Sequence, residues 1–188
     1  PDLTHTAAPG DAGLAYAVLR GLTAPSGAMV AAATLGLPER AEAGRNYDYR
    51  YAWLRDQAYA GLACAVDRPY PLLDDAVAFT AARILEDGDR VAPGYRVDGS
   101  PIPEPTSPGL VGYPGGRVVV GNQVRHQFQL DAVGEFLQLV AAASRFDRLE
   151  GWHWRPLRWR SASWSAAGAA RRRDRGTLGR LLVGPSPA

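Results

Sequence analysis

Apolar residues recur at helical spacing in several stretches of the 188-residue chain. One runs from Asp11 to Leu22, a second begins at Asp56 and continues through Val66, and a third covers Leu72 to Leu85. Repeats of three and four residues place apolar side chains on one face of an α-helix, so each stretch is predicted to be helical. Asp56 is predicted to be the N-cap of the second helix, because its carboxylate can accept from free backbone N–H groups.

The most regular helical period follows Gly121. Asn122 is predicted to cap a helix that runs to about Ser144. Its apolar stripe is predicted to consist of Leu130, Val133, Leu137 and Val140, with Phe136 and Leu139 beside it. Because the long periodic segments are all helical, the predicted fold class is all-α.

Other stretches lack this period. Ala28 to Glu39 is small and apolar and is broken by Gly36 and Pro38, so a buried loop or a short extended piece is expected. Gly88 to Gly121 is rich in Gly and Pro, which predicts a long structured loop with a functional role. Asn46 to Trp53 alternates in character, which predicts an extended chain. Its aromatic residues would lie in one row on one side: Tyr47, Tyr49, Tyr51 and Trp53.

The composition is that of a globular protein, with 46% hydrophobic and 21% charged residues. The longest apolar stretch is too short to cross a bilayer, so a cytoplasmic location is expected. Secretion stays an alternative, because the chain begins at Pro1 rather than Met. Cys64 is expected to be a buried, inert thiol. The three histidines are His5, His126 and His153, and they do not have the spacing of metal ligands. Neither a metal nor a cofactor is expected.

Charge divides the chain at about residue 150. Residues 1–150 carry an excess of acidic side chains, whereas residues 151–188 contain eight arginines, one aspartate and four of the five tryptophans. The second segment shows no helical or strand period. The chain has no lysine, which suggests a GC-rich gene. Residues 151–188 are therefore interpreted as a frameshifted or otherwise aberrant tail, with a disordered basic extension and a nucleic-acid-binding arm as the alternatives. The predicted domain covers residues 1–150.

The richest candidate site is the segment from Arg45 to Asp56. A sugar requires flat apolar surfaces for its C–H faces and charged groups for its hydroxyls, and this segment places aromatic rings beside carboxylate and guanidinium groups. The alternative is a structural hairpin whose aromatic residues fill the core. The pattern alone does not separate the two interpretations.

Four segments of the chain together resemble one known family. NYDYRYAWLRD, residues 46–56, closely resembles the signature of glycoside hydrolase family 15, which contains glucoamylases, glucodextranases and bacterial trehalases. Three further segments are similar to the family in the same order: LTAPSGAMVAAATLGLPE (22–39), GYRVDG (94–99) and GYPGGRVVVGNQVRHQFQLDAVGE (112–135). By this resemblance the chain is identified as the N-terminal part of the family's catalytic domain.

The resemblance implies a partial (α/α)6 toroid, in which inner and outer helices surround a pocket for the terminal glucose of a glucoside. It implies that Arg55 and Asp56 bind hydroxyls of that glucose. Trp53 and Tyr49 would line the same subsite, with Tyr49 stabilising positive charge in the transition state. Three further residues are implied on loops that face the pocket: Asp98, Tyr113 and Asn122. At Leu35 and Gly36 the chain departs from the small hydroxyl residues that are usual in relatives.

No catalytic residue is identified in the chain. The family inverts the anomeric centre with two glutamates that lie beyond the central helix, and no Glu follows Glu150. Asp131 and Glu135 share one helix face and therefore cannot flank a glycosidic bond. Asp74 and Asp75 are expected to reflect the preference for acidic residues in the first turn of a helix.

The predicted function is that of a truncated glycoside hydrolase, whose full-length form would release glucose from an α-glucoside, an oligosaccharide or trehalose. The chain itself is expected to be inactive, and a non-catalytic carbohydrate-binding fragment is the alternative. No nucleic-acid or membrane partner is predicted. Helices without their toroid neighbours would expose apolar stripes, so self-association is expected.

Overall fold

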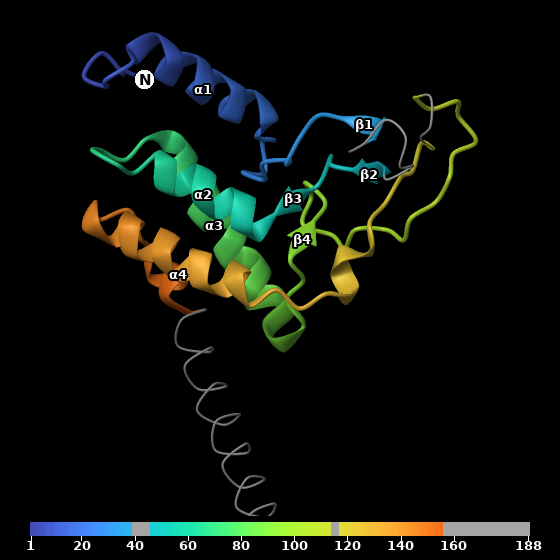
Figure 1. Cartoon of the computed structure of the whole chain (residues 1–188). Coiled ribbons are helices and arrows are strands. Elements are labelled where there is room, and N and C mark those ends of the chain that lie inside the picture. The colour runs from blue at the N-terminus through green and yellow to red at the C-terminus, as the bar shows by residue number, and fades with distance from the viewer. Residues whose placement is uncertain (39–45, 114–116, 156–188) are drawn as a thin grey trace, which may run out of the picture.

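The computed structural model describes residues 1–38, 46–113 and 117–155 (Figure 1). Within these ranges the chain is mostly helical. The α-helices are α1 (Pro9–Leu22), α2 (Leu54–Ala63), α3 (Pro71–Asp87) and α4 (Leu130–Arg145). The 3-10 helices are η1 (Gly88–Arg90), η2 (Gln123–His126) and η3 (Gly151–Trp154). The strands are β1 (Leu35–Pro38), β2 (Asn46–Asp48), β3 (Ala52–Trp53) and β4 (Gly94–Tyr95).

Helices α2, α3 and α4 form the core of the molecule (Figure 1). α2 and α4 lie side by side and run in the same direction, because Arg55 contacts Asp131 near their starts and Arg145 contacts Ala65 near their ends. α3 packs against both in the opposite direction. At Gly61 a Cβ atom would lie 2.6 Å from Leu139 Cδ1, so this close approach of the helices requires glycine.

The start of α2 is determined by a strand rather than by a side-chain cap. β3 pairs antiparallel with β4 up to Trp53, and the next amide, that of Leu54, donates to the carbonyl oxygen of Pro93 at 2.9 Å. The first free N–H of the helix is therefore satisfied by the neighbouring loop. The predicted N-cap was wrong: Trp53 is the N-cap, and Asp56 lies in the first turn of the helix, where a negative charge is favourable.

The long helix that the sequence predicts after Asn122 begins later in the structure, and the segment before α4 is only partly helical. Asn122 does act as a cap, accepting from the amide of Val124 at 2.9 Å, but it caps the short helix η2. The backbone is then extended at Gln127 and Gln129, and α4 begins only at Leu130. Gln129 reaches across to Arg55 from this extended segment. The extended segment that separates η2 from α4 thus contacts α2. Periodicity alone did not reveal this break in the helix.

The buried face of α4 is also different from the predicted stripe. Val133 and Val140 are buried as predicted, but Leu130 and Leu137 are 52% and 49% exposed. The buried residues are Ala132, Val133, Phe136, Leu139, Val140, Ala142 and Ala143. α4 packs against both α2 and α3, so its buried face is broader than one stripe and is rotated away from Leu130.

The predicted aromatic row is divided between two strand pairs. β2 pairs antiparallel with β1, which confirms a short extended piece within residues 28–39, and β3 pairs with β4. Tyr47 and Tyr49 contact each other edge to face with ring centroids 6.2 Å apart, while Tyr51 and Trp53 form a separate pair at 6.5 Å. Tyr51 and Trp53 are buried and Tyr47 is exposed, so the four rings do not share one face.

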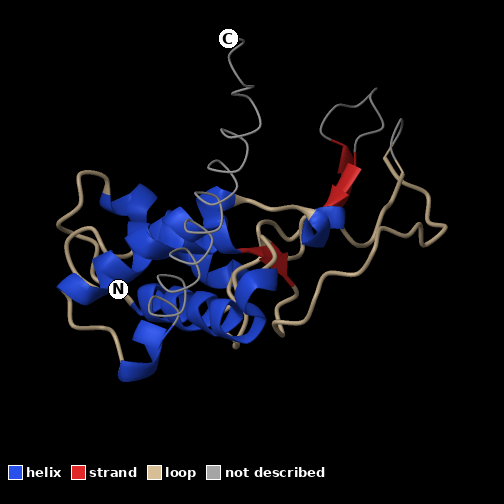
Figure 2. Ribbon diagram, turned by 90° about the horizontal axis from the view of Figure 1, so that it is seen from below, coloured by secondary structure: helices blue, strands red, loops and turns tan. Residues whose placement is uncertain are grey.

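The remaining predictions concern α1 and the long loop. α1 forms as expected and packs its Tyr16 and Leu19 against the core. Residues 88–121 are mostly irregular, apart from η1 and β4, in their described part. Figure 2 shows the α-helices gathered at one end of the molecule and the β1–β2 pair with the long loop at the other. Among the described residues, no helix has the length and apolar character needed to span a membrane.

Candidate functional site

The candidate site lies where β3 passes into α2, next to the start of α4. Trp53 is the last residue of β3, and Arg55 and Asp56 occupy the first turn of α2. Because α2 and α4 are parallel neighbours, the first turn of α4 lies beside this turn. The site therefore forms at the boundary between the helical end of the molecule and its loops (Figure 1).

The guanidinium group of Arg55 is held by two residues from the start of α4. Its Nη1 donates to Oε1 of Gln129 and to Oδ2 of Asp131, each at 3.1 Å. These two bonds use both hydrogens of Nη1. The side chain is 36% exposed, and no hydrogen bond within the described ranges uses its Nη2 or Nε. Three donors of a fixed, planar group thus remain for a ligand.

Asp56 lies beside this free edge of Arg55. Its Oδ2 is 3.6 Å from Nη2 of Arg55, which is an ion pair but is too long for a hydrogen bond. This oxygen is buried and has no hydrogen-bond partner among the described residues, although the carboxylate as a whole is about one-third exposed. A buried acceptor without a donor is unfavourable. A ligand could reach this carboxylate only at its exposed part, because Oδ2 itself has almost no accessible surface.

Trp53 and Tyr49 are less accessible than these charged residues. Trp53 is buried and packs with Tyr51, Ile102 and Val124. Tyr49 is partly buried beside Tyr47. The structure thus places Trp53 two residues before Arg55, within a small core cluster. The role of Trp53 and Tyr49 as walls of a glucose subsite stays a prediction.

A completely buried carboxylate organises the chain around these residues. Asp48 accepts two hydrogen bonds from the Arg50 guanidinium, at 2.9 and 3.0 Å, and one from the amide of Gly121 at 3.2 Å. Burial alone would raise the pKa of Asp48, but these donors outweigh it and hold the pKa below its ordinary value. Alternation in the sequence placed Asp48 opposite the aromatic residues but did not reveal its burial.

Gly121 brings the loop that carries Asn122 to this carboxylate. Its φ of +96° is in the left-handed region, and a Cβ atom there would lie 2.4 Å from the carbonyl oxygen of Glu104. Only glycine fits this position. Through Gly121, Asn122 is placed beside β2, and through Val124 the same loop packs on Trp53.

Two predicted site residues are not joined to this group. Asp98 closes its own turn, accepting from the amide of Ser100 at 2.9 Å and from its hydroxyl at 2.6 Å, and these bonds hold its pKa below the ordinary value. Tyr113 is exposed on the loop. None of the hydrogen bonds or ion pairs between described residues connects either of them to Arg55. Their assignment to the pocket stays a prediction.

Asp131 and Glu135 project from one face of α4, as predicted, and both contact α2. Asp131 pairs with Arg55, and Glu135 accepts from the Tyr59 hydroxyl at 3.1 Å, which raises the pKa of that hydroxyl. The sequence predicted the shared helix face but did not reveal these partners on α2. Asp74 lies in the first turn of α3, as predicted, and Asp74 and Asp75 also form ion pairs with Arg148 and Arg20.

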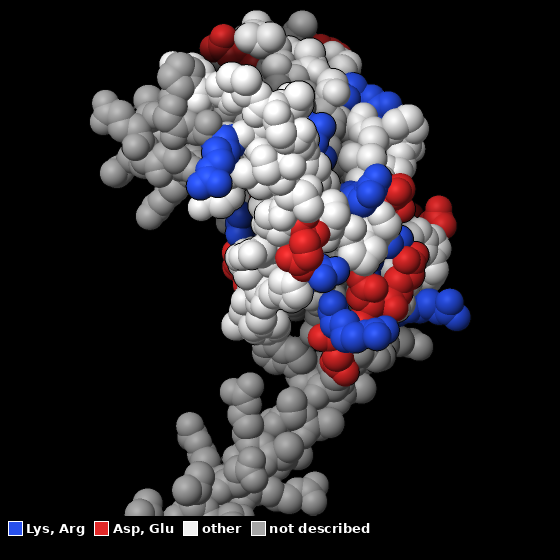
Figure 3. Space-filling model, turned by 90° about the vertical axis from the view of Figure 1, so that its right-hand side faces the viewer, with Lys and Arg blue, Asp and Glu red and all other residues white. Residues whose placement is uncertain are grey.

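The charge around Arg55 is more negative than positive, because Asp56, Asp131 and Glu135 accompany one guanidinium. A site of this kind suits a neutral, hydroxyl-rich ligand better than an anion. On the face drawn in Figure 3, acidic and basic side chains lie next to one another and do not form a patch of one sign.

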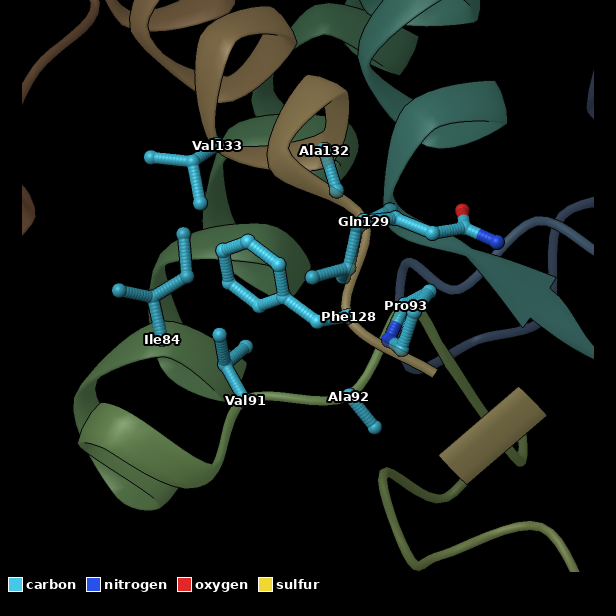
Figure 4. A pocket seen from close by; sticks show the side chains of 9 residues that line it. Ile84, Val91, Ala92, Pro93, Phe128, Gln129, Ala132 and Val133 are labelled. Atoms are coloured by element: carbon cyan, nitrogen blue, oxygen red, sulfur yellow. The ribbon is translucent and has the colours of Figure 1, made fainter. Parts of the chain in front are cut away.

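A small cavity lies behind the site, between the starts of α2 and α4 and the end of α3 (Figure 4). Its volume is about 10 Å³ and its lining is almost entirely apolar, including Ile84, Val91, Phe128 and Val133. It is too small for a sugar. Figure 4 shows that the stem of Gln129 lies at this cavity while its amide group points away from it. The described part of the chain contains no cluster of three or more His, Cys, Asp or Glu side chains that could hold a metal ion.

Comparison with known proteins identifies one family. The model of glycosyl hydrolases family 15 matches residues 14–166, so the match continues past Glu150. Trehalase 1 of Sulfolobus acidocaldarius is 36% identical over 176 residues, which cover 85% of this chain and 30% of that protein. The tail assignment at residues 151–188 stays a prediction, and residues 156–188 lie outside the described ranges.

Two further relatives bear similar names. The trehalase of Mycolicibacterium smegmatis is 38% identical over 131 residues, covering 65% of this chain and 19% of that protein. The trehalase of Thermoplasma acidophilum is 33% identical over 124 residues, covering 64% and 21% respectively. The chain thus spans about a fifth to a third of the length of these relatives. No solved structure shows a significant match.

Proposed function

Because the chain belongs to glycosyl hydrolase family 15, we propose that it supplies the glucose-binding wall of a trehalase-type enzyme. The whole protein would hydrolyse the α-glucosidic bond of trehalose with inversion and release glucose. Three relatives named trehalase support this substrate over the starch-derived substrates of glucoamylases. The class of reaction, glycoside hydrolysis, follows from the family.

The proposed architecture is part of an (α/α)6 toroid. In such a toroid, neighbouring inner helices run in the same direction, and each is connected to the next through an outer helix of opposite direction. The arrangement of α2, α3 and α4 is consistent with one such unit, with α2 and α4 as inner helices and α3 as the outer one. Arg55 and Asp56 then lie at the end of the inner ring where the starts of its helices meet.

One observation carries the proposed function: Arg55 and Asp56 present complementary groups to one ligand. Within the described ranges Arg55 has three donors without a hydrogen bond on a fixed group, and the neighbouring Asp56 carboxylate is about one-third exposed. A pair of adjacent sugar hydroxyls donates and accepts at the same time, so it fits a neighbouring donor and acceptor. The excess of carboxylates disfavours a phosphorylated sugar.

This wall binds sugar but does not cleave it in our proposal. Inversion requires an acid and a base on opposite sides of the bond, about 6.5–9.5 Å apart. Asp131 and Glu135 lie on one helix face and are already engaged with α2. The catalytic carboxylates would therefore come from outside this wall, and the 188-residue chain is expected to bind without turnover.

Calorimetric titration of the 188-residue chain with trehalose tests the binding role. We expect binding that is lost in Asp56→Asn and retained in Asp75→Asn, which alters a carboxylate of similar exposure that pairs with Arg20 on α1. A chain with native helical circular dichroism that binds no trehalose would refute the proposal. Release of glucose from trehalose by this chain would contradict the expected lack of turnover.

A further inference from the structure

The first turn of α4 and the residue before it contact the Arg55 guanidinium at a single nitrogen. Gln129 and Asp131 are two residues apart, and both place a side-chain oxygen 3.1 Å from the same nitrogen, Nη1. The two acceptors belong to different backbone conformations, since Gln129 is extended and Asp131 is helical. The break before α4 is what allows both to reach one atom.

We propose that Gln129 and Asp131 are positioning residues, which fix the guanidinium plane of Arg55 so that its Nη2 and Nε edge faces the sugar. This role rests on the proposed function. Arg has several rotatable bonds, and a free side chain loses rotamer freedom when it binds a ligand. Two acceptors on Nη1 fix the guanidinium plane before the ligand arrives, so less freedom is lost on binding.

Gln129 is itself held in place. Its stem lines the apolar cavity formed with Leu54, Pro93 and Ala132, while its amide points away toward α2 (Figure 4). Its Nε2 donates to Oε1 of Gln127 at 3.0 Å, which orients the amide so that Oε1 faces Arg55. An amide fixed at both ends is suited to orient a third group.

Asp131 adds a charge that Gln129 lacks. It is exposed in the first turn of α4, and its Oδ2 forms an ion pair with Arg55. Exposed ion pairs contribute little to stability on their own. The pair is better explained as a device that fixes the direction of the guanidinium, since a neutral and a charged acceptor share the same nitrogen.

Nuclear magnetic resonance of the Arg55 guanidinium in the full 188-residue chain tests the positioning without a ligand. Slow rotation of a held guanidinium gives separate signals for its Nη hydrogens. We expect separate signals in the wild-type chain, averaged signals in Asp131→Ala and Gln129→Ala, and partial recovery in Asp131→Asn and Gln129→Glu, which keep an oxygen acceptor. Signals that stay separate in both alanine variants would overturn the inference.

Trehalose titration provides the second test. Asp131→Ala is expected to weaken affinity about fivefold in the wild-type background and to have no further effect when Arg55 is already Ala, because the residue acts through Arg55. Gln138→Ala, an exposed amide on the same helix, is the control for effects on α4 as a whole. Equal losses in both backgrounds would show a merely structural role and overturn the proposal. A folded wild-type chain without affinity would overturn the proposed function instead.

Discussion

The amide of Gly121 donates to Oδ2 of Asp48 at 3.2 Å and joins two segments that are 73 residues apart. The same carboxylate accepts from Arg50, two residues along the chain. Asp48 thus connects the aromatic segment before α2 to the loop before α4. The two segments that surround the candidate site are held together at this carboxylate.

Removal of this carboxylate is expected to destabilise the chain. In Asp48→Ala the buried amide of Gly121 loses its acceptor, which costs about 1–3 kcal/mol, whereas the Arg50 guanidinium is partly exposed and can be rehydrated. Asp48→Asn keeps one acceptor oxygen and should lose less. Urea denaturation followed by circular dichroism measures both, and a variant with an unchanged midpoint would contradict the role assigned to Asp48.

The contribution of Asp48 should depend on pH. Its pKa in the folded chain lies below the ordinary value of 3.8, so the ionised form is favoured by folding. The stabilisation is complete above pH 3.8 and is lost as the pH falls below 3.8 and through the lower folded pKa. The difference in free energy of unfolding between wild type and Asp48→Asn should therefore shrink in acid. A difference that grows on acidification would contradict the expected direction of the pH dependence.

Gly121→Ala and Gly134→Ala should change stability in opposite directions. The first places a Cβ atom 2.4 Å from the Glu104 carbonyl oxygen at a φ of +96°, and a loss of about 1–3 kcal/mol is expected. Gly134 lies exposed within α4, where a Cβ atom meets nothing within 4 Å, and alanine there should stabilise by about 0.5–1 kcal/mol. Thermal unfolding of both variants checks the pair.

Cys64 should be unreactive in the folded chain. The thiol is buried, and burial raises its pKa to about 11, so little thiolate exists at pH 8. Labelling with a thiol-specific reagent at pH 8 is expected to be slow in buffer and rapid in urea. Immediate, complete labelling without denaturant would show that the helix end near Cys64 opens readily.

The outer face of α4 should promote self-association. Leu130 and Leu137 lie seven residues apart and are about half exposed. The exposed Gly134 lies between them along the helix, and the exposed Ala141 follows Leu137 by one turn. Replacement of both leucines by Gln should weaken association about tenfold, as measured by sedimentation velocity. Val111→Gln, a change at a fully exposed loop residue, is the control. If association persists unchanged in the double variant, another surface is responsible.

The sequence alone predicted the existence and approximate extent of α1, α2 and α3, the long loop and the cluster around Arg55 and Asp56. These features depend on interactions within a few residues. The helix period is such a feature, and so is the adjacency of a guanidinium and a carboxylate. For the same reason the sequence predicts that Asn122 is a cap, although it does not show that the capped helix is the short η2.

Only the tertiary structure decided where α2 and α4 begin, which face of α4 is buried and which acceptors hold Arg55. α2 begins at Leu54 because the Pro93 carbonyl satisfies its first amide, and Asp131 turns toward Arg55, 76 residues away. Such pairings depend on chain segments that meet only after folding. A local pattern specifies the donors and acceptors that a segment carries, and packing determines which of them meet.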